Sequence, residues 1–319
     1  MFKVSSRHPL IASRSISMVH ARAFSFTDDS TSVSYPTASA VTNAGAVGNS
    51  LTGPHSLDTA LILFQLRYTQ SCWYQELFQS SRDPLQNAST YIWQMCHEMR
   101  EWSESFPETL PLAFKDFFDL ELLYSYVYCL APSCRVQTVS AYGKTLIFEY
   151  SIAYMQKMFP ISKDPINTAF YTYHDALRVY FVGSQFIAVL IGNEDQLLDS
   201  ILPYTSPVAG SPPPPPLPSN GGVDNTDRST NCITHIRETL KTFGHRWEDS
   251  KALLASFESQ AEPLLATLRG RKRQIETRLK QGQSPPSFVS QASFGTGNVA
   301  KDGWDSMGGS YVNARGQPS

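Results

Sequence analysis

Apolar residues recur with helical spacing late in the chain, between Cys232 and Glu262. They are three, four or seven residues apart and so fall on one face of a helix: Ile233, Ile236, Leu240, Phe243, Trp247, Leu254 and Phe257. Most other positions in this stretch are polar or charged. The pattern predicts one long helix of about seven turns, whose apolar face packs against other helices. It contains no side chain placed for catalysis, which favours a structural role.

The same periodicity predicts further helices. Their approximate ranges are 56–80, 87–105, 116–130, 136–158 and 167–191. Ser56 or Asp58 is the expected N-cap of the first helix. The helix 116–130 is apolar around most of its circumference and is therefore expected to be buried, with Asp119 and Glu121 as ordinary surface charges. No alternating pattern is long enough for a sheet, so the predicted fold class is all-α, a multi-helix domain with disordered tails at both ends.

Changes in composition divide the chain into segments. Residues 1–55 form a basic, Ser-rich tail, 56–192 the first part of the helical domain, 193–230 a proline-rich loop, 231–268 the long helix that completes the domain, and 269–319 a basic cluster with a disordered tail. The run Pro212–Pro216 cannot be a helix or a central strand and is expected to be an extended, solvated loop. A docking site for a proline-recognising domain is the alternative.

Composition narrows the classes of partner and compartment. The formal net charge is −2, so the overall field of the molecule does not attract nucleic acid or membranes. The most apolar stretch, 176–192, contains Arg178 and Gln185, and its uninterrupted apolar part is too short to span a bilayer. We therefore expect no membrane partner. Five cysteines without a Cys-x-x-Cys pair predict buried free thiols in a reducing compartment.

The first residues of the chain raise a second hypothesis about localisation. Four basic residues precede the first acidic residue, Asp28, with many serines between them: Lys3, Arg7, Arg14 and Arg22. This composition resembles a mitochondrial transit peptide. The alternative is a disordered tail with scattered basic residues and no targeting role.

Motifs of common enzyme and cofactor sites are missing from the sequence. It has no phosphate-binding glycine loop and no clustered zinc ligands, and His97-Glu98 lacks the second His of a zinc-protease helix. A nucleophile at Cys72 or Cys96 with His97 as its base would need a tertiary coincidence, because sequence neighbours do not face each other on a helix. We therefore expect no enzyme activity, no cofactor and no metal.

Two groups of residues are candidates for binding. A short basic cluster is typical of a nuclear-import signal or a phosphate contact, although cations also suit a solvated helix end. Its members are Arg269, Arg271, Lys272 and Arg273. Aromatic residues form a second candidate, an effector pocket, for which packing in the helix core is the stronger interpretation. These residues are Tyr124, Tyr128 and Trp247.

Five helical phrases follow one another over roughly residues 57–265. They lie at 63–78, 99–107, 119–133, 173–190 and 232–258. The first resembles a Leu-Arg-x-x-Gln-Ser helix and the second a Trp-x-x-x-Leu-Pro helix end, with Phe106 in place of Leu. The third is similar to a helix that ends Leu-x-Arg-Pro-Ser, with Ala131 in place of Arg, and the fourth to a Phe-x-x-Gly hydrophobic helix. The fifth resembles a Cys-x-x-x-Leu…Arg-Trp…Phe-Glu helix at Cys232, Leu240, Arg246, Trp247, Phe257 and Glu258.

In this order the phrases resemble the regulatory region of fungal zinc-binuclear-cluster transcription factors. The resemblance implies an all-helical region in the nucleus that modulates a DNA-bound activator or repressor of one metabolic pathway or biosynthetic gene cluster. Its expected partners are the transcription machinery or a full-length zinc-cluster regulator, as a homo- or heterodimer. The family reads DNA with six clustered cysteines and two zinc ions, and residues 1–55 contain no cysteine.

The absence of these cysteines has two interpretations. Either the sequence is the regulatory fragment of a longer transcription factor, or the protein works without its own DNA reader. Contact with DNA is then indirect, or weak and salt-sensitive through residues 268–280. Two alternatives remain beside the transcriptional regulator: a mitochondrial helical protein or enzyme, and a helical adaptor that pairs with a complete transcription factor.

Overall fold

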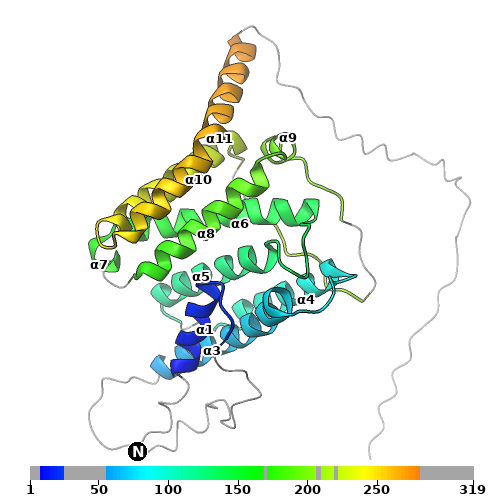
Figure 1. Cartoon of the computed structure of the whole chain (residues 1–319), viewed down its shortest axis with the longest axis vertical. Helices are drawn as coiled ribbons and strands as arrows, with labels where there is room; N and C mark the ends of the chain where they lie inside the picture. Colours follow the sequence, from blue (N-terminus) through cyan, green and yellow to red (C-terminus); the bar gives the residue numbers. More distant parts are fainter. Residues whose placement is uncertain are drawn as a thin grey trace, which may run out of the picture. The chain divides into compact units, whose positions relative to one another are not determined.

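The computed structural model describes residues 8–24, 55–108, 110–168, 171–205, 210–218 and 222–280. The regular elements in these ranges are helices and none is a strand, which confirms the predicted all-α fold class. In chain order they are α1 (His8–Val19), α3 (His55–Tyr74), the π-helical turn η3 (Gln75–Gln79), α4 (Ala88–Glu104), α5 (Leu112–Leu130), α6 (Ala141–Lys163), α7 (Pro165–Thr168), α8 (Tyr173–Leu190), α9 (Glu194–Leu198), α10 (Asn225–Gly244) and α11 (Asp249–Lys280) (Figure 1). The described residues up to Gln274 form one compact unit, and the described residues 275–280 belong to a second.

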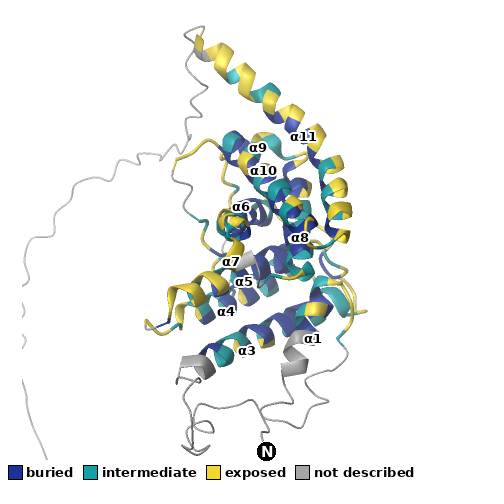
Figure 2. Cartoon of the chain, turned by 90° about the vertical axis from the view of Figure 1, so that its left-hand side faces the viewer, coloured by how far each residue is buried: buried dark blue, intermediate teal, exposed yellow. Residues whose placement is uncertain are grey.

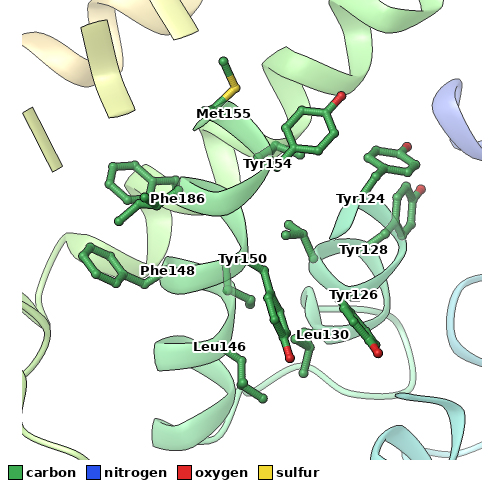
Figure 3. Close-up of a cluster of buried hydrophobic side chains, with 14 of the residues drawn as sticks. Tyr124, Tyr126, Tyr128, Leu130, Leu146, Phe148, Tyr150, Tyr154, Met155 and Phe186 are labelled. Carbon is green, nitrogen blue, oxygen red and sulfur yellow. The ribbon is translucent and has the colours of Figure 1, made fainter. Parts of the chain in front are cut away.

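Helices α5, α6, α8 and α10 form the centre of the compact unit. α6 packs against the other three, and buried residues gather where these helices meet (Figure 2). Tyr126 of α5 stacks on Tyr150 of α6 with ring centroids 4.8 Å apart (Figure 3). Phe148 of α6 stacks on Phe186 of α8 at 5.4 Å. These large apolar rings remove much surface from water, so they are the main stabilising contacts of the centre.

Helices α3 and α4, which precede α5 in the sequence, pack against it. Trp102 at the end of α4 contacts the Phe118 ring of α5 at 5.6 Å, and its indole Nε1 donates a 2.7 Å hydrogen bond to the carbonyl of Ile62 in α3. The predicted helix ranges are confirmed here to within a few residues. The predicted cap is wrong, because α3 begins at His55 and both Ser56 and Asp58 lie inside its first turn.

Helix α1 corrects the expectation that residues 1–55 form a disordered tail. Residues 8–19 are helical and pack against α3 and α8. Met18 is 2% exposed, and its carbonyl accepts a 3.0 Å hydrogen bond from the Tyr128 hydroxyl. The Tyr74 hydroxyl donates to the carbonyl of Arg22 at 3.1 Å. The segment is poor in helical periodicity, so its order comes from these distant partners. Residues 1–7 and 25–54 of the expected tail lie outside the described residues.

The predicted long helix is broken in two. A turn at residues 245–248 ends α10, and α11 folds back along it, so Arg237 Nη2 lies 2.9 Å from Glu258 Oε1. In a continuous helix these two residues would be about 30 Å apart. Gly244, a poor helix former, ends α10. The reversal brings Phe257 into the same core as the α10 stripe, where it is fully buried.

The second helix also extends further than predicted. α11 continues through Pro263 to Lys280, so the basic cluster lies on a helix and not at the start of a disordered tail. Leu264 and Leu268 are buried behind the proline, and this apolar contact stabilises the helix beyond Pro263. Residues 281–319 lie outside the described residues.

The proline-rich loop is shorter than the predicted 193–230. Residues 194–198 form α9, and α10 begins at Asn225 with Asp224 as its N-cap. Residues 211–218, here called the proline strap, lie on α6. The hydroxyls of Tyr142 and Tyr150 donate 3.0 Å hydrogen bonds to the carbonyls of Pro215 and Pro216. A proline carbonyl can only accept, and the two tyrosines supply the donors, so the strap is held within the domain.

Candidate functional site

The predicted basic cluster lies on α11 beside α9 and α10. Arg271 pairs with Asp195 of α9 at 3.3 Å and with Asp199, which directly follows α9. Lys272 Nζ lies 2.6 Å from Asp227 Oδ1 in the first turn of α10. Two of the candidate cations therefore join α11 to its neighbours, a role that the sequence alone did not indicate.

The other two cations of the cluster face more solvent. Arg269 Nη1 lies 3.8 Å from Glu262 Oε1, and 60% of the Arg269 side chain is exposed. Arg273 Nε donates to the carbonyl of Arg269 at 3.3 Å. Carboxylates thus offset part of the cluster's charge, so a nuclear-import receptor or a phosphate group would compete with them. Its role in import or phosphate binding stays a prediction.

A buried ionic cluster joins three helices near the centre of the domain. Glu121 of α5 is 2% exposed and lies between Arg67 of α3, at 2.8 Å, and Arg178 of α8, at 2.7 Å. The Arg67 guanidinium also donates to Gln70 Oε1 at 2.7 Å, and Gln70 Nε2 donates to Ser125 Oγ at 2.6 Å. The expectation that Glu121 is a surface charge is therefore wrong. A carboxylate buried this deeply needs charged partners, and two guanidinium groups supply them.

The electrostatics of this cluster keep the carboxylate ionised. Burial alone would raise the pKa of Glu121, but the Arg178 and Arg67 guanidiniums outweigh it and hold that pKa at about 2. Arg178 also lies over the ring of Tyr124, with its guanidinium carbon 5.0 Å from the ring centroid. Each charge in the cluster faces an opposite charge, so the arrangement clamps α3, α5 and α8 together. One feature of the sequence could have indicated this cluster: Glu121 is a single acid in the middle of an otherwise apolar helix face.

A second buried ion pair connects α6 to α10. Glu149 accepts two hydrogen bonds from Arg228, of 2.9 and 2.5 Å, and both side chains are less than a tenth exposed. Arg228 also donates to Asn225 Oδ1 at 2.6 Å, and Asn225 Nδ2 donates to the carbonyl of Leu197 at 2.6 Å. Sequence reasoning missed this pair because its members lie far apart in the chain.

A pocket of about 210 Å³ opens beside this second ion pair. Its walls come from α6, α9, the start of α10 and the end of the proline strap. The apolar lining includes Phe148, Leu197 and Leu217, and the polar lining includes Gln196 and Asn225. The pocket is therefore a concave, mostly apolar space with a few convergent polar groups, which is the usual form of a small-molecule site.

Cys96 and His97, considered above as a nucleophile and its base, make separate contacts in the structure. Cys96 is 1% exposed and packs in the core near Cys129, and burial raises the pKa of the Cys129 thiol. His97 Nδ1 lies 3.0 Å from Arg100 Nη2, and its Nε2 lies 3.4 Å from Glu101. The prediction that most thiols are buried and free is confirmed for the described cysteines.

The proposed aromatic effector pocket is closed by packing. Tyr124 and Tyr128 are both buried, and Tyr128 stacks on Phe181 with ring centroids 4.5 Å apart. Trp247 packs against Phe243 at 5.8 Å, with the Arg246 guanidinium over its ring at 4.4 Å. Core packing therefore accounts for Tyr124 and Tyr128, and Trp247 is partly buried against the same core.

Within the described ranges, no group of His, Cys, Asp and Glu residues is arranged to hold a metal ion. The described helices also include none that is both long and apolar enough to cross a membrane. This chain matches no family model, no curated protein and no solved structure. The resemblance to fungal zinc-cluster regulators therefore stays a prediction from the sequence.

Proposed function

We propose that this chain is the helical regulatory region of a nuclear transcriptional regulator of a fungal metabolic pathway or biosynthetic gene cluster. It acts through contacts with the transcription machinery or with a complete zinc-cluster regulator, and carries out no reaction of its own. One observation carries the proposal. The five segments that resemble the family also supply residues that join the helices of this domain.

The polar members of three phrases meet in one buried cluster. Arg67 and Gln70 belong to the first phrase, Glu121 and Ser125 to the third, and Arg178 to the fourth. Buried charges need opposite charges beside them, and here those opposite charges come from different phrases. These contacts support treating the phrases as parts of one domain.

The remaining phrases are joined by close packing. A Cβ added at Gly183, in the fourth phrase, would lie 2.9 Å from Phe257 Cε2 and 3.1 Å from Ile236 Cγ2, both in the fifth. Glycine is therefore required where α8 meets α10 and α11. The second phrase contributes Trp102, which is hydrogen-bonded to the carbonyl of Ile62, directly before the first phrase.

The contacts of α1 count against the cleaved leader that the mitochondrial alternative requires. Removal of a transit peptide ending near Asp28 would take Met18 out of the core and leave the hydroxyls of Tyr74 and Tyr128 without their carbonyl acceptors. Buried hydroxyls that lose their partners destabilise a protein. The segment is thus better explained as a permanent part of the domain than as a cleaved leader.

An exposed apolar patch at the start of α5 supports the partner contacts in this proposal. Phe114 and Phe117 are 42% and 38% exposed, lie three residues apart on one helix face, and follow Leu112, which is 78% exposed. Contiguous apolar side chains on a surface are typical of protein–protein contacts. The patch suits a helical partner, whether a second copy of this chain or a full-length regulator.

Localisation and transcript measurements test the proposal directly. A tagged full chain expressed from its own gene is expected in the nucleus with its N-terminal segment intact, and deletion of the gene is expected to change a limited set of transcripts. A protein excluded from the nucleus, together with unchanged transcripts, would refute the proposal. Recovery of a shortened protein from mitochondria would support the alternative.

A reporter experiment tests which surface acts. The chain is fused to a heterologous sequence-specific DNA-binding module, and expression from its target promoter is measured. The fusion is expected to change expression, and Phe114→Ser with Phe117→Ser is expected to reduce the effect. Exchange of two exposed residues on α3 and α11, Gln65→Ser and Gln260→Ser, is the matched control. Equal loss in both double variants would contradict a role for the patch.

A further inference from the structure

The pocket beside the second ion pair has a composition that specifies a class of ligand. Phe148 of α6, Leu197 of α9 and Leu217 of the proline strap form apolar walls around about 210 Å³. A cavity of about 150 Å³ accommodates a benzene ring. The space is therefore large enough for one ring with a short substituent.

The charged groups at this pocket are already neutralised. Glu149 lines the pocket, and both of its oxygens accept hydrogen bonds from Arg228. Asn225 is likewise occupied by Arg228, the Leu197 carbonyl and Ser200 Oγ. A charged ligand would have to break this pair or remain uncompensated, so the lining favours a neutral molecule.

Two hydrogen-bond donors point to an acceptor on the ligand. Gln196 Nε2 is buried and has no hydrogen-bond partner among the described residues, although the side chain lines the pocket. Ser200 Oγ accepts a 3.0 Å bond from Asn225 Nδ2, which leaves its own proton free to donate. A buried amide donor without a partner is costly, and rotation of the Gln196 side chain toward a carbonyl oxygen in the pocket would remove that cost.

The backbone at the rim of the pocket is strained. Ser200 has a φ of 56°, in the left-handed region that favours glycine. It follows α9, and the amide of Ile201 donates to the carbonyl of Gln196 at 2.9 Å, which closes the helix end. Such non-glycine outliers cluster at ligand-binding sites. Ser200 and the following Ile201 both line the pocket.

We propose that this pocket binds a neutral, mostly apolar small molecule through a carbonyl oxygen, with Gln196 and Ser200 as the donors. The site goes beyond the proposed regulatory function and does not depend on it, because binding can be measured on the purified chain without any transcriptional readout. As a consequence for regulation, a ligand there would contact α9, the helix that carries Asp195, one of the partners of Arg271 in the basic cluster.

The test compares two probes of nearly equal shape on the purified full chain. Acetophenone has a ring and a carbonyl, whereas ethylbenzene has the ring without an acceptor. Affinities are measured by ligand-observed NMR titration. Acetophenone is expected to bind about fivefold more tightly, the effect of one hydrogen bond of ordinary net strength. Equal affinities, or no binding of either probe at millimolar concentration, would overturn the proposal.

Variants locate the site. Gln196→Leu is expected to abolish the preference for acetophenone, whereas Gln65→Leu, an exposed position on α3, is expected to retain it. Leu217→Trp, which fills the pocket from the strap, is expected to abolish binding of both probes. Unchanged binding in Leu217→Trp, or a retained preference in Gln196→Leu, would overturn the assignment. Circular dichroism establishes that each variant is folded.

Discussion

Replacement of Glu121 by glutamine tests the central claim about the buried ionic cluster. Glutamine keeps the size of the side chain and removes the charge, so Arg67 and Arg178 are left buried without their counter-ion. Breaking a buried ion pair from one side typically costs about 3–5 kcal/mol of unfolding free energy. The pKa leads to a similar figure, because a fall from 4.5 to about 2 corresponds to about 3 kcal/mol at neutral pH.

The assay is urea unfolding at pH 7, followed by tryptophan fluorescence, since Trp73, Trp93 and Trp102 are buried. Glu121→Gln is expected to lower the unfolding free energy by about 3 kcal/mol, or the melting temperature by about 6–12 °C. Glu238→Gln is the matched control. Its pair with Lys163, at 3.5 Å, is more than a third exposed on both sides and should contribute less than about 1 kcal/mol.

The pH dependence provides a second, independent signature. The pKa of Glu121 is lower in the folded than in the unfolded state, so its contribution is complete above pH 4.5 and is lost as pH falls toward 2. The stability difference between wild type and Glu121→Gln should shrink over that interval. A cost below about 1 kcal/mol at pH 7, or a difference that does not change between pH 5 and pH 2, would refute this account of the cluster.

Four further substitutions test other parts of the fold. Gly183→Ala should lower the free energy of unfolding by about 1–3 kcal/mol, because its Cβ crowds Phe257. Gly270→Ala, whose Cβ would have nothing within 4 Å, should raise it by up to about 1 kcal/mol. Equal urea midpoints of the two variants would contradict this. Ala21→Gly should raise the melting temperature slightly, since Ala21 has a φ of 50° after α1, and a lower value would count against that strain. Tyr150→Phe should lose about 1 kcal/mol and speed proteolysis of the proline strap, and an unchanged cleavage rate would show that the hydrogen bond does not hold it.

Much of the fold follows from local periodicity. The ranges of α4 and α5 match the predicted helices to within four residues, and α6 and α8 overlap theirs with ends displaced by up to six, because apolar positions three and four apart have to share a face whatever lies opposite. The prediction of one continuous long helix is wrong for an identifiable reason. Its stripe has one gap, the seven-residue step from Trp247 to Leu254, and the turn at residues 245–248 that separates α10 from α11 overlaps the start of this gap.

The candidate site was less accessible to prediction. The basic residues of α11 were identified from composition, but their partners Asp195, Asp199 and Asp227 are 45 or more residues away. The pocket depends on four separate segments, and no short pattern marks Gln196 or Ser200 as its donors. A sequence pattern reports neighbours within about one helical turn, and these contacts lie far outside that range.

The sequence by itself determined the class of this protein, an all-α domain, and the identity of most of its helices. Helix formation depends on the spacing of apolar residues along a few turns, and that spacing is visible in the chain. Only the tertiary structure decided that Met18 belongs to the core, that Phe257 returns to it, and that Glu121 is a buried counter-ion. Those outcomes depend on which surfaces meet, because burial and ion pairing take their free energy from partners remote in sequence.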